Sequence, residues 1–361
     1  MFISLRVEYD FSNATQPLAT MKMSILVLVV TSLGLTRTLG AADAPSAPRK
    51  AGEYSLTADS LPQDGVPKGR LEGPFEFRSK IIAGTVRQYW IFVPAQYREE
   101  KPAGLLVFQD GQRALNPMGP LRVDQVMENL IHKKDMPVSI GLFVTPGNLS
   151  DHYPDNLGMS NPNNRANEYD VLRDAYARML IEELIPEVAK KYKISDDPAA
   201  RVIGGTSSGA ICAWTVAWER PEQFRKVISM IGSYTSIGYR PARGNQPMIP
   251  GGDLYPTLIR KNPIKPIRIF LQDGTNDLSN ITDTKGFNGW IALSNEQGNW
   301  HLANEQMLSA LEFANANADR KKIEGPRYDL NHVWGDGAHS DDHGGALLPD
   351  ILRWMYRDFA K

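Results

Sequence analysis

The sequence predicts an α/β protein in which helices cover both faces of a mostly parallel central sheet. Apolar runs of strand length alternate with segments of helical spacing along the chain. The run 104–108 is continuously apolar, which is typical of a strand buried on both faces. Ligands bind beyond the carboxyl ends of the strands in such sheets, so the polar turns after the strands are candidate functional sites.

The pattern of apolar residues gives the expected elements in order. Short apolar or alternating segments bounded by turns indicate strands, and longer segments with apolar residues at helical spacing indicate helices. The expected strands are 75–82, 86–94, 104–108, 138–145, 202–203, 226–230, 267–271 and 328–334. The expected helices are 120–133, 168–192, a helix from the turn at 205–209 to about 219, 253–261, 300–316 and 347–359.

The N-terminal region has the order of a secretory signal peptide. A lysine at 22 precedes the apolar run 24–35, and small residues follow at 40–42. The apolar run is shorter than a typical membrane-spanning helix. A short N-terminal anchor that is not cleaved is the alternative. Residues 1–20 have no role in such a signal, so we expect translation to begin at Met21 or Met23, with an unusually long positive region as the alternative.

The chain is expected to contain one domain after this signal. Residues 1–42 form the N-terminal extension and signal peptide, and 43–63 a flexible leader rich in Ala, Pro and Ser. The domain itself covers 64–361. Lys and Arg number 40 against 41 Asp and Glu, so the charge indicates no nucleic-acid partner. The single cysteine, Cys212, excludes an intramolecular disulfide and is expected to be buried.

The turn 205–209, Gly-Thr-Ser-Ser-Gly, fits the pattern Gly-x-Ser-x-Gly with Ser207 at its centre. It lies between a short apolar strand and an apolar helix. A sharp turn of this kind lifts a serine hydroxyl above the sheet edge, and flanking side chains would block it. The helix then directs free N–H groups toward a developing oxyanion. Ser207 is therefore the predicted nucleophile, with a structural turn serine as the alternative.

The general base is predicted to be His339, which follows the last expected strand, 328–334. An imidazole titrates near neutral pH, so it can take the Ser207 proton and return it to the leaving alcohol. His343, four residues further on, is its competitor. The cluster 339–343 could also supply metal ligands, but consecutive carboxylates on a loop are usually solvated, so no metal is expected.

The acid is predicted to be Asp277, in the Gly-Thr-Asn-Asp sequence that follows the strand 267–271. It would hold the imidazole in the productive tautomer and stabilise its charged form. Asp273, at the same strand end and closer to the apolar run, is the competing candidate, and Glu305 is a more distant one. The chain order serine, acid, histidine is that of α/β-hydrolases.

Segments along most of the chain carry a family resemblance. They are 138–147, 164–165, 168–170, 204–214, 270–277 and 335–354, of which 204–214 and 339–345 are the most specific. Over roughly 70–361 the chain resembles the enterochelin esterase and feruloyl esterase family of α/β-hydrolases. The resemblance implies that fold and a serine esterase activity without a metal or organic cofactor. An apparent insertion, 282–297, departs from the family pattern and could change the substrate.

Further candidates surround the predicted nucleophile. The Ser208 N–H is expected to donate to the oxyanion, with the N–H of Gln112, or that of Gly111, as the second donor. Arg165 could bind a substrate carboxylate or sugar hydroxyl, or form a structural ion pair. Tryptophans could stack on a sugar or aryl ring or pack in the core, and the candidates are Trp290, Trp300 and Trp334.

The combined expectation is a secreted or periplasmic serine esterase whose partner is a small-molecule or carbohydrate ester. The resemblance implies carbohydrate-linked acyl esters or siderophore-type esters. An acyl group would pass to Ser207 and then to water activated by His339. An acyltransferase of the same fold and a non-catalytic ligand-binding relative are the alternatives. A peptidase is ranked last, because no repeat or second domain that would gate peptides is apparent.

Overall fold

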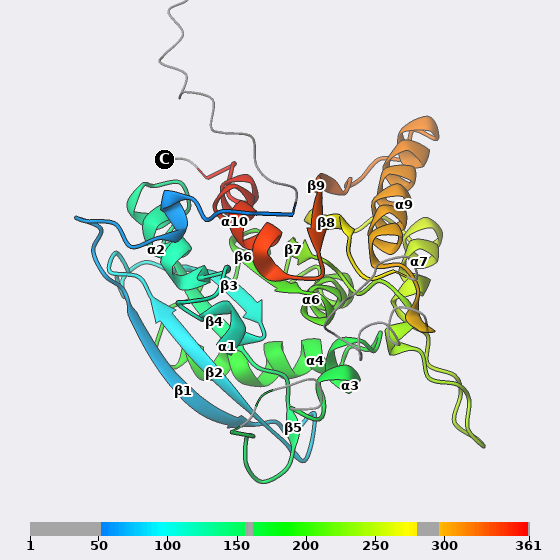
Figure 1. Ribbon diagram of the computed structural model, residues 1–361, viewed down its shortest axis with the longest axis horizontal. Coiled ribbons are helices and arrows are strands. Elements are labelled where there is room, and N and C mark those ends of the chain that lie inside the picture. The colour runs from blue at the N-terminus through cyan, green and yellow to red at the C-terminus, as the bar shows by residue number, and fades with distance from the viewer. Residues whose placement is uncertain (1–51, 156, 158–161, 280–295, 360–361) are drawn as a thin grey trace, which may run out of the picture. The chain divides into compact units, whose positions relative to one another are not determined.

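The computed structural model describes residues 52–155, 157, 162–279 and 296–359. This part of the chain forms a nine-stranded sheet with helices on both faces (Figure 1), which confirms the predicted fold class. The strands are β1 Arg70–Arg78, β2 Thr85–Val93, β3 Gly104–Gln109, β4 Ser139–Val144, β5 Asn148–Leu149, β6 Arg201–Thr206, β7 Lys226–Met230, β8 Arg268–Asn276 and β9 Asp329–Ala338. The helices are α1 Gly111–Ala114, α2 Val123–His132, α3 Arg165–Tyr169, α4 Ala175–Arg178, α5 Ile185–Ala189, α6 Ser208–Glu219, α7 Tyr255–Lys261, α9 Trp300–Arg320 and α10 Asp341–Met355.

The strand order is β1-β2-β4-β3-β6-β7-β8-β9, with β5 paired to β2. The strands from β4 to β9 along this order run parallel, whereas β1 and β2 are antiparallel to their neighbours. After β3 the chain makes β4 on one side and then returns to the other side of β3 for β6. Ligands of parallel sheets bind at such a reversal, and the turns 109–112 and 205–209 both lie there.

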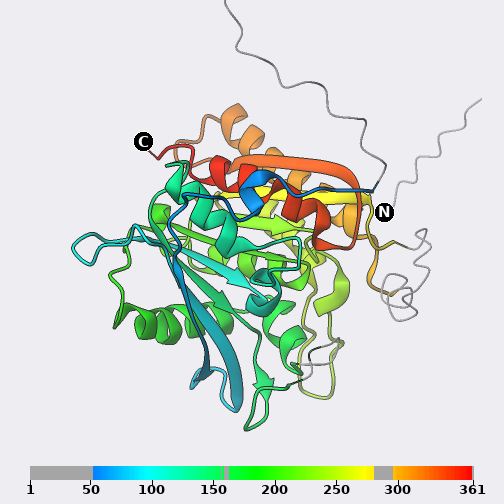
Figure 2. The same ribbon diagram turned by 60° about the vertical axis from the view of Figure 1, so that its left-hand side comes forward.

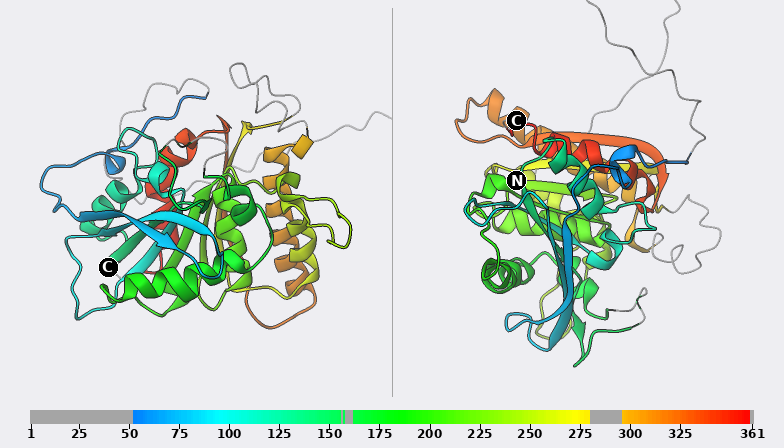
Figure 3. Two further views of the ribbon diagram at one scale, coloured as in Figure 1. Left: turned by 90° about the horizontal axis from the view of Figure 1, so that it is seen from below. Right: turned by 90° about the vertical axis from the view of Figure 1, so that its left-hand side faces the viewer.

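Both faces of the sheet are buried under helices (Figures 2 and 3). Side chains of β3 alternate between the faces, and Leu105 and Val107 join one apolar cluster while Leu106 and Phe108 join the other. All four are fully buried. The first cluster contains residues of α4, α5, α6, α7 and α9, and the second contains residues of α2 and α10. The continuously apolar run predicted this double burial.

The helix expected over 168–192 is wrong as a continuous element. Helix α3 ends at Tyr169, and the chain turns before α4 begins at Ala175. A π-helical segment, Met179–Leu184, then joins α4 to α5. Pro186 accounts for this irregularity, because it has no N–H to donate one turn back and its ring clashes with the preceding turn.

The closing helix expected over 347–359 begins earlier, because α10 runs over Asp341–Met355. The pair Gly344 and Gly345 was expected to precede the helix, but both residues lie inside it. A Cβ on Gly344 would lie 2.5 Å from the sulfur of Met230, and one on Gly345 would overlap the carbonyl of Pro120. These glycines therefore allow α10 to pack closely on its neighbours, and they do not end the helix.

Strands β8 and β9 extend beyond the expected segments 267–271 and 328–334. In the extension Gly274 pairs with Gly335, and a Cβ on Gly274 would lie 2.5 Å from the nitrogen of Gly337. Glycine allows the two backbones to approach this closely. The two strands therefore continue as a pair and carry the residues after them to the same edge.

The described part of the expected leader, 52–63, contacts the domain. The hydroxyl of Tyr54 donates to Asp336 Oδ1 at 2.6 Å, and its ring stacks on that of His343 with centroids 4.1 Å apart. This stretch is therefore anchored to β9 and α10. The expected N-terminal extension and signal peptide, 1–42, lie outside the described residues, and within those residues no helix is long and apolar enough to cross a bilayer.

Candidate active site

Ser207 occupies a strained turn between β6 and α6. Its φ is 57° and its ψ is −124°, a conformation that residues other than glycine rarely adopt. The turn is so sharp that a Cβ on Gly205 would lie 2.5 Å from the carbonyl carbon of Gly209. The Ser207 N–H donates to the carbonyl of Met230 at 3.0 Å, which ties the turn to the end of β7. The local fold thus holds the hydroxyl at the carboxyl edge of the sheet.

The structure brings Ser207, His339 and Asp277 together at this edge. The Nε2 atom of His339 lies 2.9 Å from the Ser207 Oγ, and its Nδ1 atom lies 2.6 Å from the Asp277 Oδ1. The three residues follow β6, β9 and β8 respectively. Both distances are those of hydrogen bonds, so a proton can pass from hydroxyl to imidazole without rearrangement.

The competing base and acids have other partners. His343 lies in the first turn of α10, and its Nδ1 atom is 2.8 Å from the side-chain nitrogen of Gln272. Asp273 is fully buried and accepts a hydrogen bond of 2.7 Å from Asn304. Glu305 lies on α9 and approaches a histidine of the same helix. The geometry therefore favours the residues first predicted over each of these competitors.

Burial controls the protonation of the pair beside the serine. It lowers the pKa of His339 to about 4, so the imidazole is neutral at neutral pH and can accept a proton. Burial raises the pKa of Asp277 to about 7, while hydrogen bonds from Asp273 and the Leu278 N–H oppose that rise. Burial and the neighbouring charge of Asp277 raise the pKa of Asp273 well above its ordinary value. Two adjacent buried carboxyls do not readily ionise together, and the larger rise in the pKa of Asp273 means that Asp277 ionises first.

Both expected oxyanion donors lie in the first turn of a helix. Ser208 is the first residue of α6, and Gln112 is the second residue of α1, which follows β3. The first N–H groups of a helix have no carbonyl one turn earlier, so they are available to a ligand, and the helix dipole favours an anion there. Gly111 packs so closely on β4 that a Cβ would lie 2.7 Å from the carbonyl carbon of Phe143. The arrangement suits an oxyanion at the reversal between β3 and β6.

Arg165 forms an ion pair. Its Nε and Nη2 atoms donate to the two carboxylate oxygens of Asp110 at 3.0 Å and 2.8 Å, and its guanidinium lies 5.3 Å from the centre of the Tyr169 ring. This geometry fits the structural interpretation of Arg165. Because Asp110 begins the turn that carries Gln112, the pair also fixes the position of that oxyanion candidate.

The tryptophans differ in their surroundings. Trp300 is fully buried, and its ring meets that of His339 edge-on with centroids 5.8 Å apart. A ring this buried offers no face to a sugar, so the structure does not support stacking by Trp300. Trp334 is half-buried and meets the ring of His301 edge-on. Trp290 and most of the insertion 282–297 lie outside the described residues.

Two features around the site were not expected from the sequence. Ser233, in the turn after β7, has its Oγ 3.2 Å from the Ser207 Oγ. Its place just beyond a strand end was the available signal. Arg87, inside β2, forms a buried ion pair with Glu168 at 2.8 Å. A cation inside an alternating apolar strand signalled a buried partner, but not which one.

Residues 339–343 do not converge on one point. Asp341 pairs with Arg113, and Asp342 accepts a hydrogen bond from Ser340. Among the residues that the structure describes, no group of three or more His, Cys, Asp or Glu side chains could hold a metal ion.

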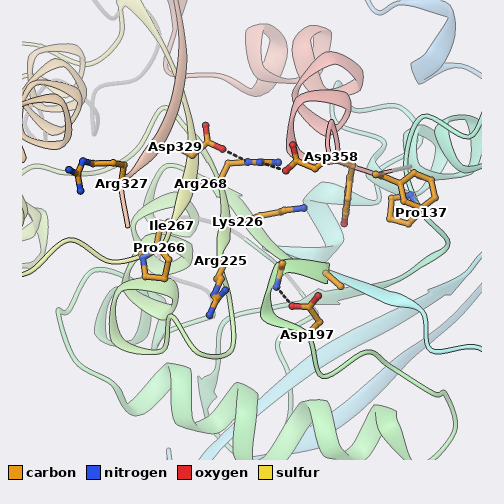
Figure 4. Close-up of a pocket in the computed structure, with 14 residues that line it drawn as sticks. Pro137, Asp197, Arg225, Lys226, Pro266, Ile267, Arg268, Arg327, Asp329 and Asp358 are labelled. Atoms are coloured by element: carbon orange, nitrogen blue, oxygen red, sulfur yellow. Dashed lines mark hydrogen bonds and ion pairs between the residues drawn. The ribbon is translucent and has the colours of Figure 1, made fainter. Parts of the chain in front are cut away.

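A pocket of about 470 Å³ lies at the opposite edge, near the amino ends of β7, β8 and β9 (Figure 4). Arg268 crosses it and pairs with Asp329 and Asp358. None of its lining residues is Ser207, His339 or Asp277, so this pocket lies apart from the candidate site at the carboxyl edge.

Comparisons with known proteins point to one family. An enterobactin esterase from Shigella flexneri is 21% identical in sequence, and its structure matches with a TM-score of 0.56. The match covers 87% of this chain but only 64% of the length of the esterase. A ferulic acid esterase from Anaeromyces mucronatus is 16% identical, with a TM-score of 0.56 over 85% of this chain and 97% of its own. No curated protein matches the sequence. A family model described as "Putative esterase" matches residues 82–288, more than half of the chain, which therefore belongs to this esterase family.

Proposed function

We propose that the protein is an exported serine hydrolase of carboxylic esters. Ser207 is the nucleophile, His339 the general base and acid, and Asp277 the residue that orients the imidazole. The observation that carries the proposal is the line of hydrogen-bond distances, 2.9 Å and 2.6 Å, that joins these three side chains. Membership in an esterase family supports the same class of reaction.

In the first half-reaction the Ser207 Oγ attacks the ester carbonyl carbon while its proton passes to His339 Nε2. The charge of Asp277 stabilises the imidazolium that forms. The carbonyl oxygen becomes an oxyanion, to which the N–H groups of Ser208 and Gln112 donate. The imidazolium then gives its proton to the alcohol as the carbon–oxygen bond breaks, which leaves the acyl group on Ser207.

In the second half-reaction water takes the place of the alcohol. His339 removes a proton from the water, whose oxygen attacks the acyl carbon, and the same backbone donors hold the second oxyanion. When this intermediate collapses, its electron pair returns to the Ser207 Oγ, and the imidazolium reprotonates that oxygen. The acid is released and the starting state is restored.

The substrates that we propose are acyl esters of carbohydrates, of the feruloyl or acetyl type, and siderophore-type esters. Among the similar solved structures, the Shigella flexneri esterase was determined in the presence of 2,3-dihydroxy-N-benzoyl-serine, and the Anaeromyces mucronatus enzyme in complex with ferulic acid. The proposal of export rests on the signal-like order of charged, apolar and small residues within 21–42.

Hydrolysis of p-nitrophenyl acetate and methyl ferulate by the wild type and Ser207→Ala tests the proposal. We expect kcat to fall on the order of 10⁴-fold or more in the variant, because no other group replaces the nucleophile. A fluorophosphonate should label the wild type and not the variant. Equal rates for the two proteins, or an unlabelled wild type with measurable ester binding, would contradict the proposal. A new ester formed with added sugar alcohol would identify a transferase.

A further inference from the structure

The hydroxyl of Ser233 is a second polar partner of the nucleophile. Its Oγ lies 3.2 Å from the Ser207 Oγ, and the Ser233 N–H donates to the Ser207 carbonyl at 3.3 Å. Ser233 is fully buried. The turn that carries it includes Ile231 at a φ of 43°, which is unfavourable for a β-branched residue and persists only where the surroundings enforce it. The fold therefore holds this hydroxyl against the reacting oxygen.

The partners of Ser233 and Ser207 together set the direction of the Ser233 proton. The Nε1–H of Trp300 can only donate, and it lies 3.1 Å from the Ser233 Oγ. Ser233 therefore accepts from the indole, and because the Ser207 proton is directed to the imidazole, the Ser233 proton is directed to the Ser207 Oγ. Ser207 in turn donates to the neutral imidazole of His339. The four groups form one chain in which each hydroxyl accepts one hydrogen bond and donates one.

We propose that Ser233 is a catalytic hydrogen-bond donor to the Ser207 Oγ, oriented by Trp300. This inference rests on the proposed function. The backbone N–H groups donate to the carbonyl oxygen of the substrate, and Ser233 adds a donor to the oxygen of the nucleophile. When the Ser207 proton passes to His339, negative charge grows on Oγ until its bond to the acyl carbon forms. The Ser233 hydroxyl donates to that charge and keeps its own proton throughout.

The same donor acts in the second half-reaction. When the acyl–oxygen bond breaks, the electron pair returns to the Ser207 Oγ before His339 reprotonates it. Charge on this oxygen thus appears in both half-reactions, and Ser233 faces it in both. The two rate constants should therefore fall together when the donor is removed, whereas substrate binding, which precedes any charge on Oγ, should not change.

Pre-steady-state bursts with p-nitrophenyl acetate test this in Ser233→Ala. We expect the acylation and deacylation rate constants each to fall about ten- to a hundredfold, as for loss of a hydrogen bond to a charged group. The matched control is Ser229→Ala, because Ser229 is equally buried and its Oγ lies 2.9 Å from the Tyr234 hydroxyl, away from the reacting atoms. We expect the control to keep both rate constants within threefold of wild type.

The pH profile separates a lost donor from a displaced base. If Ser233 only donates to Oγ, kcat/KM falls by one factor at every pH and its acid limb stays in place. An acid limb that shifts in Ser233→Ala overturns the inference, because His339 would then have moved. Both rate constants within threefold of wild type overturn it as well.

A second variant covers the case in which Ser233→Ala does not fold. Ser233→Cys nearly preserves the volume but offers only a weak donor, so we expect it to be at least fivefold slower in both steps, and wild-type rates would refute the inference. Fluorophosphonate labelling distinguishes a failure of the proposed function from a failure of the role of Ser233. If the wild type is not labelled, the proposed function fails, whereas a labelled wild type with an unaffected Ser233→Ala removes only the role of Ser233.

Discussion

The buried ion pair between Arg87 and Glu168 offers a test of how β2 and α3 are held together. The two side chains are 0% and 2% exposed, and the guanidinium donates to both oxygens of Glu168 at 2.8 Å and 3.1 Å. Glu168 also accepts from the Gly147 N–H at 3.0 Å and from Asn164 Nδ2 at 2.9 Å. In Glu168→Gln the new amide nitrogen faces donors, and a buried guanidinium loses its counter-charge.

The expected loss follows from these contacts. Removing one partner of a buried ion pair costs about 3–5 kcal/mol, because the other charge stays buried without compensation. Unfolding entropy near 2.1 cal/mol/K per residue gives about 0.6 kcal/mol/K for a folded unit of roughly 300 residues. The melting temperature of Glu168→Gln should therefore fall by about 5–8 °C.

Thermal unfolding followed by circular dichroism measures this shift. The control is Glu182→Gln, which breaks the exposed pair of Arg178 and Glu182, with side chains 43% and 50% exposed. Exposed pairs contribute less than about 1 kcal/mol, so its melting temperature should move by less than about 2 °C. A Glu168→Gln variant that melts with the control would refute this account.

The remaining predictions concern the triad, the turn and a buried carboxyl. Asp277→Asn should lower kcat on the order of 10³- to 10⁴-fold with KM little changed, because the amide favours the wrong imidazole tautomer; steady-state kinetics checks this, and a loss below tenfold would contradict it. Gly205→Ala should give little soluble protein and no activity, because a Cβ there would meet the backbone of Gly209; expression and assay decide, and a folded, active variant would exclude the steric argument. Burial raises the pKa of Asp170 to about 6 from 3.8, so the folded state binds this proton more tightly, and the free energy of unfolding falls as pH rises from about 4 to 6. Between pH 4 and pH 8, the free energy of unfolding of Asp170→Asn should therefore rise by up to about 3 kcal/mol relative to that of wild type, as measured by urea unfolding. A difference between the two proteins that does not change with pH would exclude this explanation.

Local sequence patterns predicted the elements that are largely apolar along their length and buried on all sides. The strand at 104–108 and the helix after Ser207 were found almost as expected, since a continuous apolar run has few alternatives. The pattern failed where one residue type has two roles. The closing helix was expected to begin at 347, yet Gly344 and Gly345 lie inside α10 and allow it to pack closely, which depends on neighbours that the local sequence does not reveal.

The candidate site could be predicted to the extent that the ends of the strands could be predicted. Ser207, Asp277 and His339 each follow a strand, and a parallel sheet brings such positions to one edge. The sequence could not assign Trp300 or Ser233, because their roles depend on a contact between α9 and the turn after β7. It also could not show that Arg165 is paired with Asp110, 55 positions away.

The bond between Tyr54 and Asp336 spans 282 positions, and His339 lies three residues beyond it. During synthesis the proposed nucleophile, Ser207, is therefore added to the chain well before the proposed base, His339. Until β9 pairs with β8, the imidazole of His339 is not placed beside Asp277 and Ser207, because β9 carries it to the sheet edge. In the proposed mechanism, the hydroxyl, imidazole and carboxylate therefore come together only after β9 has joined the sheet.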